Sequence, residues 1–216
     1  MTAAARDVTP GVVSYFVTGT DTGVGKTFIT ALLVKALRAG GKDAVGCKPV
    51  CCGDRDDAEL LAAASGGIDL DQVNPVWLQS PVAPYVAGLL ENRELSLPDV
   101  LEPCRRLIAA HQTVLVEGVG GWEVPIAPGL KVSDLAVEFG LPVIVVAANR
   151  LGALNHTLLT VQAVQARGLH CEGVILNQLE DELDTAAITN KGVIEDLTGV
   201  PLLAHVIHGQ DGIDMW

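Results

Sequence analysis

The sequence predicts an α/β fold, in which a parallel β-sheet is flanked by helices on both faces. Two observations support this prediction. Short, continuously apolar segments alternate along the chain with segments whose apolar residues recur at helical spacing, and strands without polar alternation are typical of parallel sheets covered on both sides. In addition, 49% of the 216 residues are hydrophobic and only 19% are charged, so residues 1–216 are expected to form one large domain with a sizeable core.

The first half of the chain is predicted to contain two strand–helix pairs. The predicted elements are strand Tyr15–Val17, helix Lys26–Arg38, strand Ala44–Lys48 and helix Asp56–Ala64. Gly40-Gly41 and Gly66-Gly67 end the two helices, and Pro49 ends the second strand. Residues 69–98 are irregular, with one short helix near residues 83–91. A stretch of this kind inside a compact domain indicates a region that covers the substrate or forms an interface.

The second half continues the alternation with stronger strand signals. The predicted elements are helix Pro98–Ala110, strand Thr113–Val116, a short helix from Ser133, strand Pro142–Ala148, helix Asn155–Arg167, strand Cys171–Leu176, helix Asp184–Leu197 and strand Leu202–Ile207. Apolar, β-branched runs mark the strands. Asn155 is interpreted as an N-cap because asparagine is favoured there.

The segment from Tyr15 to Thr27 (YFVTGTDTGVGKT) has the strand–loop–helix context of a phosphate-binding loop. Backbone N–H groups of such a loop wrap an anion, and the helix N-terminus adds partial positive charge. Lys26 is expected to reach the β- and γ-phosphates and the Thr27 hydroxyl to ligate Mg²⁺. The first glycine, Gly19, stands one residue earlier than in the common motif, with Thr20 in its place. A chance glycine-rich turn is the weaker alternative, so the segment predicts nucleotide binding and a P-loop NTPase-like fold.

Composition excludes several other classes of function. The net charge of −12 argues against a general nucleic-acid or anionic-membrane surface. Five cysteines without C-x-x-C spacing favour reduced thiols over a disulfide framework. Residues 1–10 lack the apolar run of a signal peptide, and no apolar run approaches the length of a membrane span. We therefore expect a cytoplasmic protein with no membrane and no nucleic-acid partner.

Polar residues at the predicted strand ends are candidates for chemistry, because ligands of parallel sheets bind at the carboxyl ends of the strands. Lys48, Glu117, Asn149-Arg150 and Asn177 occupy such positions. The Glu117 carboxylate is a candidate ligand of Mg²⁺, and the alternative is that Glu117 is an ordinary turn residue. The acidic run at Asp54, Asp56 and Asp57 is either a solvated helix start or a metal ligand, and the pattern leaves both open.

Four segments together resemble the dethiobiotin synthetase family. They are TGTDTGVGKT at 18–27, CKPV at 47–50, VEGVGGW at 116–122 and LGALNHTLLT at 151–160, in the family's order, and the resemblance runs from Tyr15 to about Leu203. It implies a single phosphate-loop synthetase domain that uses ATP and Mg²⁺ to close a cyclic urea on 7,8-diaminononanoate with CO₂. It also implies a homodimer with composite active sites.

The resemblance also implies roles for individual residues. The catalytic residues are Lys26 and Lys48, and Mg²⁺ is held by Thr27, Asp57 and Glu117. The nucleotide site comprises Thr22, Gly23, Val24, Gly25, Lys26, Thr27, Phe28, Asp57, Glu117, Gly118, Val119, Gly120 and Asn177, with Asn177 reading adenine. The substrate site comprises Lys48, Cys52 and the helix start Gly152, Ala153, Leu154 and Asn155. Cys52 stands where the family usually has Ser or Thr, and Lys48 nearby is expected to favour its thiolate.

The resemblance implies a mechanism and leaves two alternatives. A carbamate formed on one amine attacks the γ-phosphorus, and the second amine then closes the ring with loss of phosphate. One alternative is the ATP-binding part of a cobyrinate-type amidotransferase. Another is a nucleotide-driven switch similar to plasmid-partition and cell-division ATPases, which carry a signature lysine at the loop position occupied here by Asp21. The aspartate argues against the switch.

Overall fold

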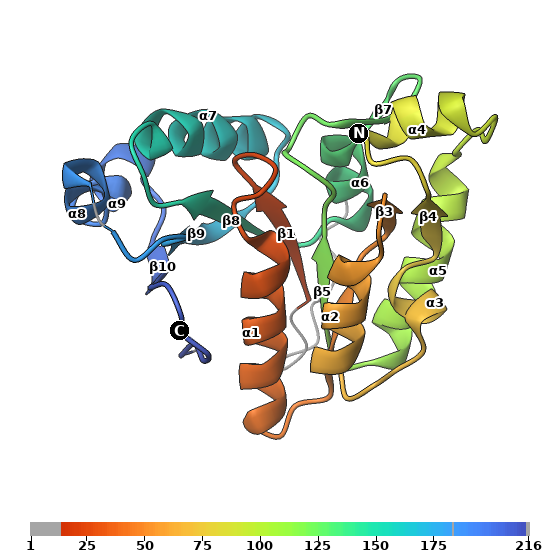
Figure 1. The fold of residues 1–216 in the computed structure, drawn as a ribbon, viewed down its shortest axis with the longest axis horizontal. Helices are drawn as coiled ribbons and strands as arrows, with labels where there is room; N and C mark the ends of the chain where they lie inside the picture. Colours follow the sequence, from red (N-terminus) through yellow and green to blue (C-terminus); the bar gives the residue numbers. More distant parts are fainter. Residues whose placement is uncertain (1–13, 183, 215–216) are drawn as a thin grey trace.

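The computed structural model describes residues 14–182 and 184–214, and its centre is a six-stranded sheet in the order β10-β9-β8-β1-β5-β2. All strand pairs in this sheet are parallel (Figure 1). The strands are β1 (Tyr15–Gly19), β2 (Ala44–Cys47), β5 (Thr113–Glu117), β8 (Val143–Ala148), β9 (Cys171–Asn177) and β10 (Leu202–Val206). The predicted fold class is confirmed, because the strands pair in parallel and the four central strands β9, β8, β1 and β5 are almost entirely buried.

Two helical layers cover the sheet. On one face, Val17, Leu115 and Ile144 pack against α1 (Lys26–Ala39) and α2 (Asp56–Ala64), which lie side by side in Figure 1. On the other face, Phe16 and Val145 join a cluster built from three helices. These are α5 (Leu97–Ala110), α6 (Val132–Phe139) and α7 (Ala153–Ala166). The central strands are mainly apolar because both of their faces lie under helices.

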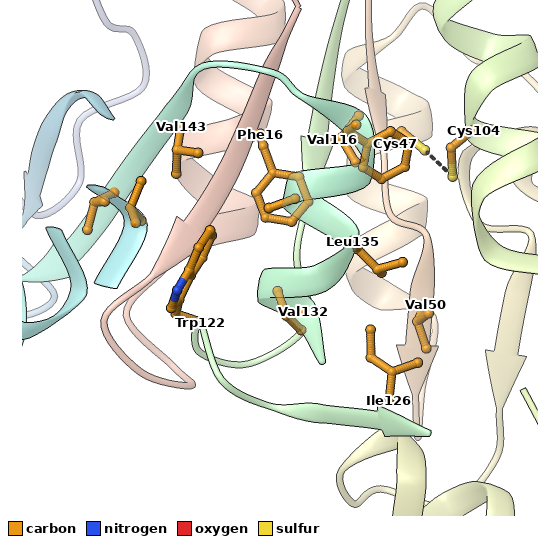
Figure 2. Close-up of a cluster of buried hydrophobic side chains, with 14 of the residues drawn as sticks. Phe16, Cys47, Val50, Cys104, Val116, Trp122, Ile126, Val132, Leu135 and Val143 are labelled. Carbon is orange, nitrogen blue, oxygen red and sulfur yellow. Dashed lines mark hydrogen bonds between the residues drawn. The ribbon is translucent and has the colours of Figure 1, made fainter. Parts of the chain in front are cut away.

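Figure 2 shows the second cluster around Phe16. The Phe16 and Trp122 rings meet edge to face, with centroids 6.4 Å apart. Cys47 of β2 and Cys104 of α5 are both fully buried, and their sulfur atoms lie 3.3 Å apart. All five cysteines are free thiols. Phe16, Trp122 and their neighbours fix the loop after β5 against β1, which holds the end of β5 next to the glycine-rich loop.

The segment predicted to be irregular contains more regular structure than expected. The short helix predicted near residues 83–91 is α4 (Pro84–Leu90). The segment also contains α3 (Leu70–Val73) and β4 (Val76–Leu78), and β4 pairs in parallel with β3 (Val50–Cys52). The small antiparallel pair of β6 (Pro125–Ala127) and β7 (Leu130–Lys131) was also not predicted. These strands have two or three residues each, which is too short for a periodic signal.

Two other predictions were wrong in detail. The single helix predicted at Asp184–Leu197 is two helices, α8 (Thr185–Asn190) and α9 (Ile194–Thr198). It breaks after Asn190, whose amide donates to the Asn149 side chain and to the Arg150 carbonyl. In addition, Gly152 caps α7 where Asn155 was predicted to do so. In the described parts of the chain, no helix has both the length and the apolar character needed to cross a bilayer.

Candidate active site

The glycine-rich loop joins β1 to α1 at the carboxyl edge of the sheet. Its conformation depends on glycine, because Gly23 and Gly25 have φ angles of 75° and 84°. Residues that carry a side chain rarely adopt such positive φ angles. Gly25 is the N-cap of α1, and Lys26 and Thr27 are the first two helical residues. Because β1 lies between β5 and β8, the loop is central on this edge, as expected for a ligand site in such a sheet.

A buried ionic cluster connects the loop to two neighbouring strands. The Lys48 ammonium donates to Asp57 Oδ2 at 2.6 Å and to Glu117 Oε1 at 2.5 Å. The Thr27 hydroxyl donates to the same Glu117 oxygen at 2.7 Å. The side chains of Lys48 and Glu117 are 4% and 0% exposed, whereas that of Asp57 is 50% exposed. Four residues predicted from separate segments are thus in direct contact.

The cluster fixes the charge of two of its members. Burial opposes the ammonium form of Lys48, but the Glu117 and Asp57 carboxylates outweigh burial and raise its pKa. Burial also opposes ionisation of Asp57, and here the Lys48 ammonium outweighs it and lowers the pKa. Lys48 and Asp57 therefore form an ion pair over the physiological pH range.

Lys26 has a different electrostatic environment. Its ammonium donates to the Asp21 carbonyl at 3.1 Å, across the loop. Burial, assisted by the charge of Lys48, lowers the pKa of Lys26 to about 8, although Glu117 and Asp57 oppose the shift. A triphosphate bound in the loop would favour the ammonium form and raise this pKa again.

Nucleotide binding is therefore expected to take up a proton near pH 8. Below this pH, Lys26 is already charged in the protein without nucleotide. Above it, the affinity for the nucleotide should fall by up to about tenfold per pH unit, because Lys26 must be protonated before the nucleotide binds. Calorimetric titration with ADP at pH 8 in buffers of different ionisation enthalpy measures the uptake. Lys26→Met should abolish it. Affinity that is flat between pH 7.5 and 9.5, with no uptake, would contradict the expectation.

A cavity of about 690 Å³ opens above the loop and the ionic cluster. The predicted site residues on its wall are Thr22, Gly23, Gly25, Lys26, Thr27, Phe28, Lys48, Cys52, Asp57, Val119 and Gly120. Gly118 is not on this wall, because it packs against Val132 and Phe16. Cys51, Leu60, Val124 and the segment 81–84 also line the cavity and were not predicted as site residues. The available signal for 81–84 was the irregular stretch itself, which was expected to cover a substrate or to form an interface.

A second cavity, of about 480 Å³, lies on the other side of the loop. It is lined by Gly25, Phe28, Leu32, Lys35, Asn177, Gln178, Leu179 and residues 207–211. The buried amide of Asn177 donates to the Val24 carbonyl at 3.0 Å. A Cβ atom on Gly25 would lie 2.1 Å from the Asn177 amide nitrogen, so only glycine fits there. The placement suits the predicted role of Asn177 beside a nucleobase.

The helix-start residues predicted for the substrate site lie outside the walls of both cavities. Gly152, Ala153, Leu154 and Asn155 form the start of α7 and line neither of the two cavities. The adjoining Leu151 side chain is 81% exposed. Within one described chain, these four residues therefore do not join the rest of the site.

The expected reactivity of Cys52 is not supported. Its thiol lines the main cavity, but burial and the nearby Glu91 raise its pKa to about 11, against a smaller opposing effect of Lys48. The thiolate predicted from the sequence is thus disfavoured, and Cys52 is present as a neutral thiol.

The residues around Thr27 suit Mg²⁺. Among the described residues, no group of three or more His, Cys, Asp or Glu forms a dedicated metal cage. Mg²⁺, however, commonly uses one or two carboxylates and the oxygens of a bound phosphate. The second oxygen of Glu117, Oε2, is buried and has no hydrogen-bond partner among the described residues. Thr27, Asp57 and Glu117 therefore supply hard oxygen donors beside the loop.

The loop, the parallel sheet and the strand-end carboxylate define a P-loop NTPase fold. A family model described as an AAA domain matches residues 13–210. A solved ParA family ATPase from Chlorobium tepidum aligns with a TM-score of 0.57 at 16% identity, covering 93% of this chain and 86% of that one. At this identity the likeness is one of fold alone.

Relatives of higher identity specify the family. A protein of Akkermansia muciniphila named ATP-dependent dethiobiotin synthetase BioD is 51% identical over 203 residues, covering 94% of this chain and 95% of its own. The Bacillus subtilis (strain 168) protein of the same name is 37% identical over 195 residues, covering 88% and 84%. The chain belongs to the dethiobiotin synthetase family. The resemblance inferred from the four sequence segments is thereby confirmed.

Proposed function

We propose that this protein catalyses the ATP-dependent ring closure of 7,8-diaminononanoate with CO₂ to dethiobiotin, releasing ADP and phosphate. The observation that carries the proposal is the placement of two lysines, Lys26 and Lys48, on the wall of one 690 Å³ cavity. Such a cavity has the size of known small-molecule sites. It can hold a triphosphate beside an apolar wall at 81–84 that suits the carbon chain of a diamine. The whole chain, residues 1–216, then acts as one synthetase domain.

The chain's residues act mainly by positioning and by charge. A carbamate oxygen attacks the γ-phosphorus of ATP, ADP leaves, and the second amine attacks the activated carbonyl and expels phosphate. Lys26 stabilises the transferring phosphoryl oxygens, and Lys48 holds the carbamate against them. Thr27, Asp57 and Glu117 would hold Mg²⁺, which neutralises phosphate charge when bound. Cys52 contacts the substrate as a neutral thiol.

The proposal is tested by direct assay. Incubation with ATP, MgCl₂, isotope-labelled bicarbonate and 7,8-diaminononanoate should give a product whose mass includes the labelled carbon. Removal of Mg²⁺ with EDTA should stop the reaction, and re-addition should restore it. ADP release that depends on DNA instead of on the diamine would contradict the proposal and would favour the nucleotide-switch alternative.

We further propose that the active unit is a homodimer in the cytoplasm. The start of α7 from one subunit would complete the cavity of the other, which accounts for the absence of Gly152–Asn155 from the cavity walls of their own chain. Exposed Leu151 and Leu159, 81% and 58% exposed, are apolar surface that a partner subunit would cover. Five free thiols suit a reducing compartment.

Mixing two inactive variants should test the composite site. Asn155→Ala should weaken diamine binding and leave ATP affinity unchanged, and Lys26→Ala should lose the nucleotide function. If subunits exchange, hybrid dimers contain one site that carries neither change, so activity should reappear on mixing. Sedimentation should show a dimer at assay concentration. A fully active monomer, or exchange of subunits without recovery, would contradict the composite site.

A further inference from the structure

A buried asparagine outside the cavity holds the backbone of Lys48. Asn74 is 2% exposed, and its amide nitrogen donates to the Lys48 carbonyl at 2.8 Å and to the Val76 carbonyl at 2.9 Å. The N–H of Lys48 donates to the carbonyl of Val73, the residue before Asn74, at 2.8 Å. Both polar backbone groups of Lys48 are thus bound to one short segment at the end of α3.

Arg55 holds Asn74 in turn. Its Nε donates to Asn74 Oδ1 at 3.1 Å, and one of its terminal nitrogens donates to the Asn74 carbonyl and to Asp71 Oδ1, both at 3.0 Å. The guanidinium also lies 5.4 Å from the centre of the Trp77 ring. Every hydrogen-bonding atom of the Asn74 side chain therefore has a partner, which fixes its orientation.

The same arginine stands at the start of the helix that carries Asp57. Arg55 is the N-cap residue of α2, and Asp57 is the second helical residue. The Arg55–Asn74 pair therefore connects the backbone of Lys48 to the first turn of α2. Neither Arg55 nor Asn74 lines the cavity.

We propose that Asn74 and Arg55 are positioning residues that hold the Lys48 ammonium at its place between Asp57 and Glu117. This role rests on the proposed function, in which Lys48 faces the reacting groups. The planar, fork-shaped guanidinium of Arg55 binds the Asn74 side-chain oxygen and the Asn74 carbonyl through two different nitrogens held at a fixed spacing. The single nitrogen of a lysine does not reproduce this geometry. Loss of the pair would let Lys48 move relative to the phosphates while the nucleotide loop stays intact.

The kinetic test compares Arg55→Met with Asp71→Ala. Arg55→Met keeps an apolar stem over Trp77 but loses the donated hydrogen bonds, and it should lower kcat about 10- to 100-fold, with the KM for ATP changed less than about threefold. Arg55→Lys should be impaired as well, because charge alone does not restore the fork. Asp71→Ala removes the exposed partner of Arg55 and should leave kcat unchanged. If Arg55→Met does not fold, the comparison between Arg55→Lys and Asp71→Ala remains.

A labelling measurement tests the position of Lys48 without turnover. Acetic anhydride should acetylate the buried Lys48 slowly in the unaltered protein and several-fold faster in Arg55→Met, relative to exposed Lys42 in the same sample. Peptide mass spectrometry reports both sites. Unchanged Lys48 labelling in the arginine variants, or full kcat in Arg55→Lys, would overturn the positioning role. Failure of the synthetase assay with faster Lys48 labelling would instead refute only the proposed function.

Discussion

Replacing Lys26 with alanine is expected to lower turnover by about 10³-fold or more, because no other ammonium on the loop can reach the phosphates. Lys26 is 6% exposed and its ammonium points across its own loop to the Asp21 carbonyl, so it is held within the loop that is proposed to bind the phosphates. The affinity for ATP should fall with it. Steady-state kinetics and calorimetric titration with ATP measure the two losses.

A matched control separates this effect from a general loss of positive charge. Lys42 is exposed in the turn after α1, at the opposite end of the same helix, and Lys42→Ala should behave as the unaltered protein. Lys26→Met keeps the aliphatic stem, so it should keep the thermal stability and still lose turnover. Full activity in Lys26→Ala would contradict the prediction that the loop binds the nucleotide.

Replacing Lys48 with methionine is expected to damage both folding and catalysis. It leaves Glu117, which is 0% exposed, without its ammonium partner at 2.5 Å. Removal of one member of a buried pair typically lowers the free energy of unfolding by about 3–5 kcal/mol. Turnover should fall by about 10²–10³-fold, since a cation beside the transferring phosphoryl group is lost. Urea unfolding and the synthetase assay measure the two effects.

The double variant Lys48→Met/Glu117→Gln distinguishes the two effects. It removes both charges, so much of the lost stability should return, while turnover should stay low because the cation and the metal ligand are both absent. Stability losses that simply add in the double variant would show that Lys48 and Glu117 are not energetically coupled.

The centre of the fold and of the candidate site could be predicted because local signals agreed there. Each long strand is marked by its own apolar run, and the rule that ligands bind at strand ends pointed to Lys48, Glu117 and Asn177. These residues do lie beside the loop. The acidic run at 54–57 could not be resolved from its pattern, and the family resemblance selected Asp57, which is the member that pairs with Lys48.

The rest depends on contacts between distant segments. The β3–β4 pair joins three-residue strands whose pairing no periodicity reveals. The cap of α7 was misassigned because Gly152, in a left-handed conformation, ends the turn before Asn155 is reached. The charge state of Cys52 depends on burial and on Glu91 at the end of α4, 39 positions away in the sequence. The role of Asn74 was invisible for the same reason, since its partners lie 19 and 26 positions away.

Because β1 lies in the middle of the sheet, it is synthesised long before the two strands that pair with it. Tyr15 pairs with Leu115 and Phe16 with Val143, so the strand that carries the nucleotide loop is made early but acquires its two neighbours late. Pairing over such distances is slow, and unpaired apolar strands are prone to aggregate. A nascent chain that ends before Val143 would therefore expose one edge of β1, and it would depend on chaperones until β8 emerges.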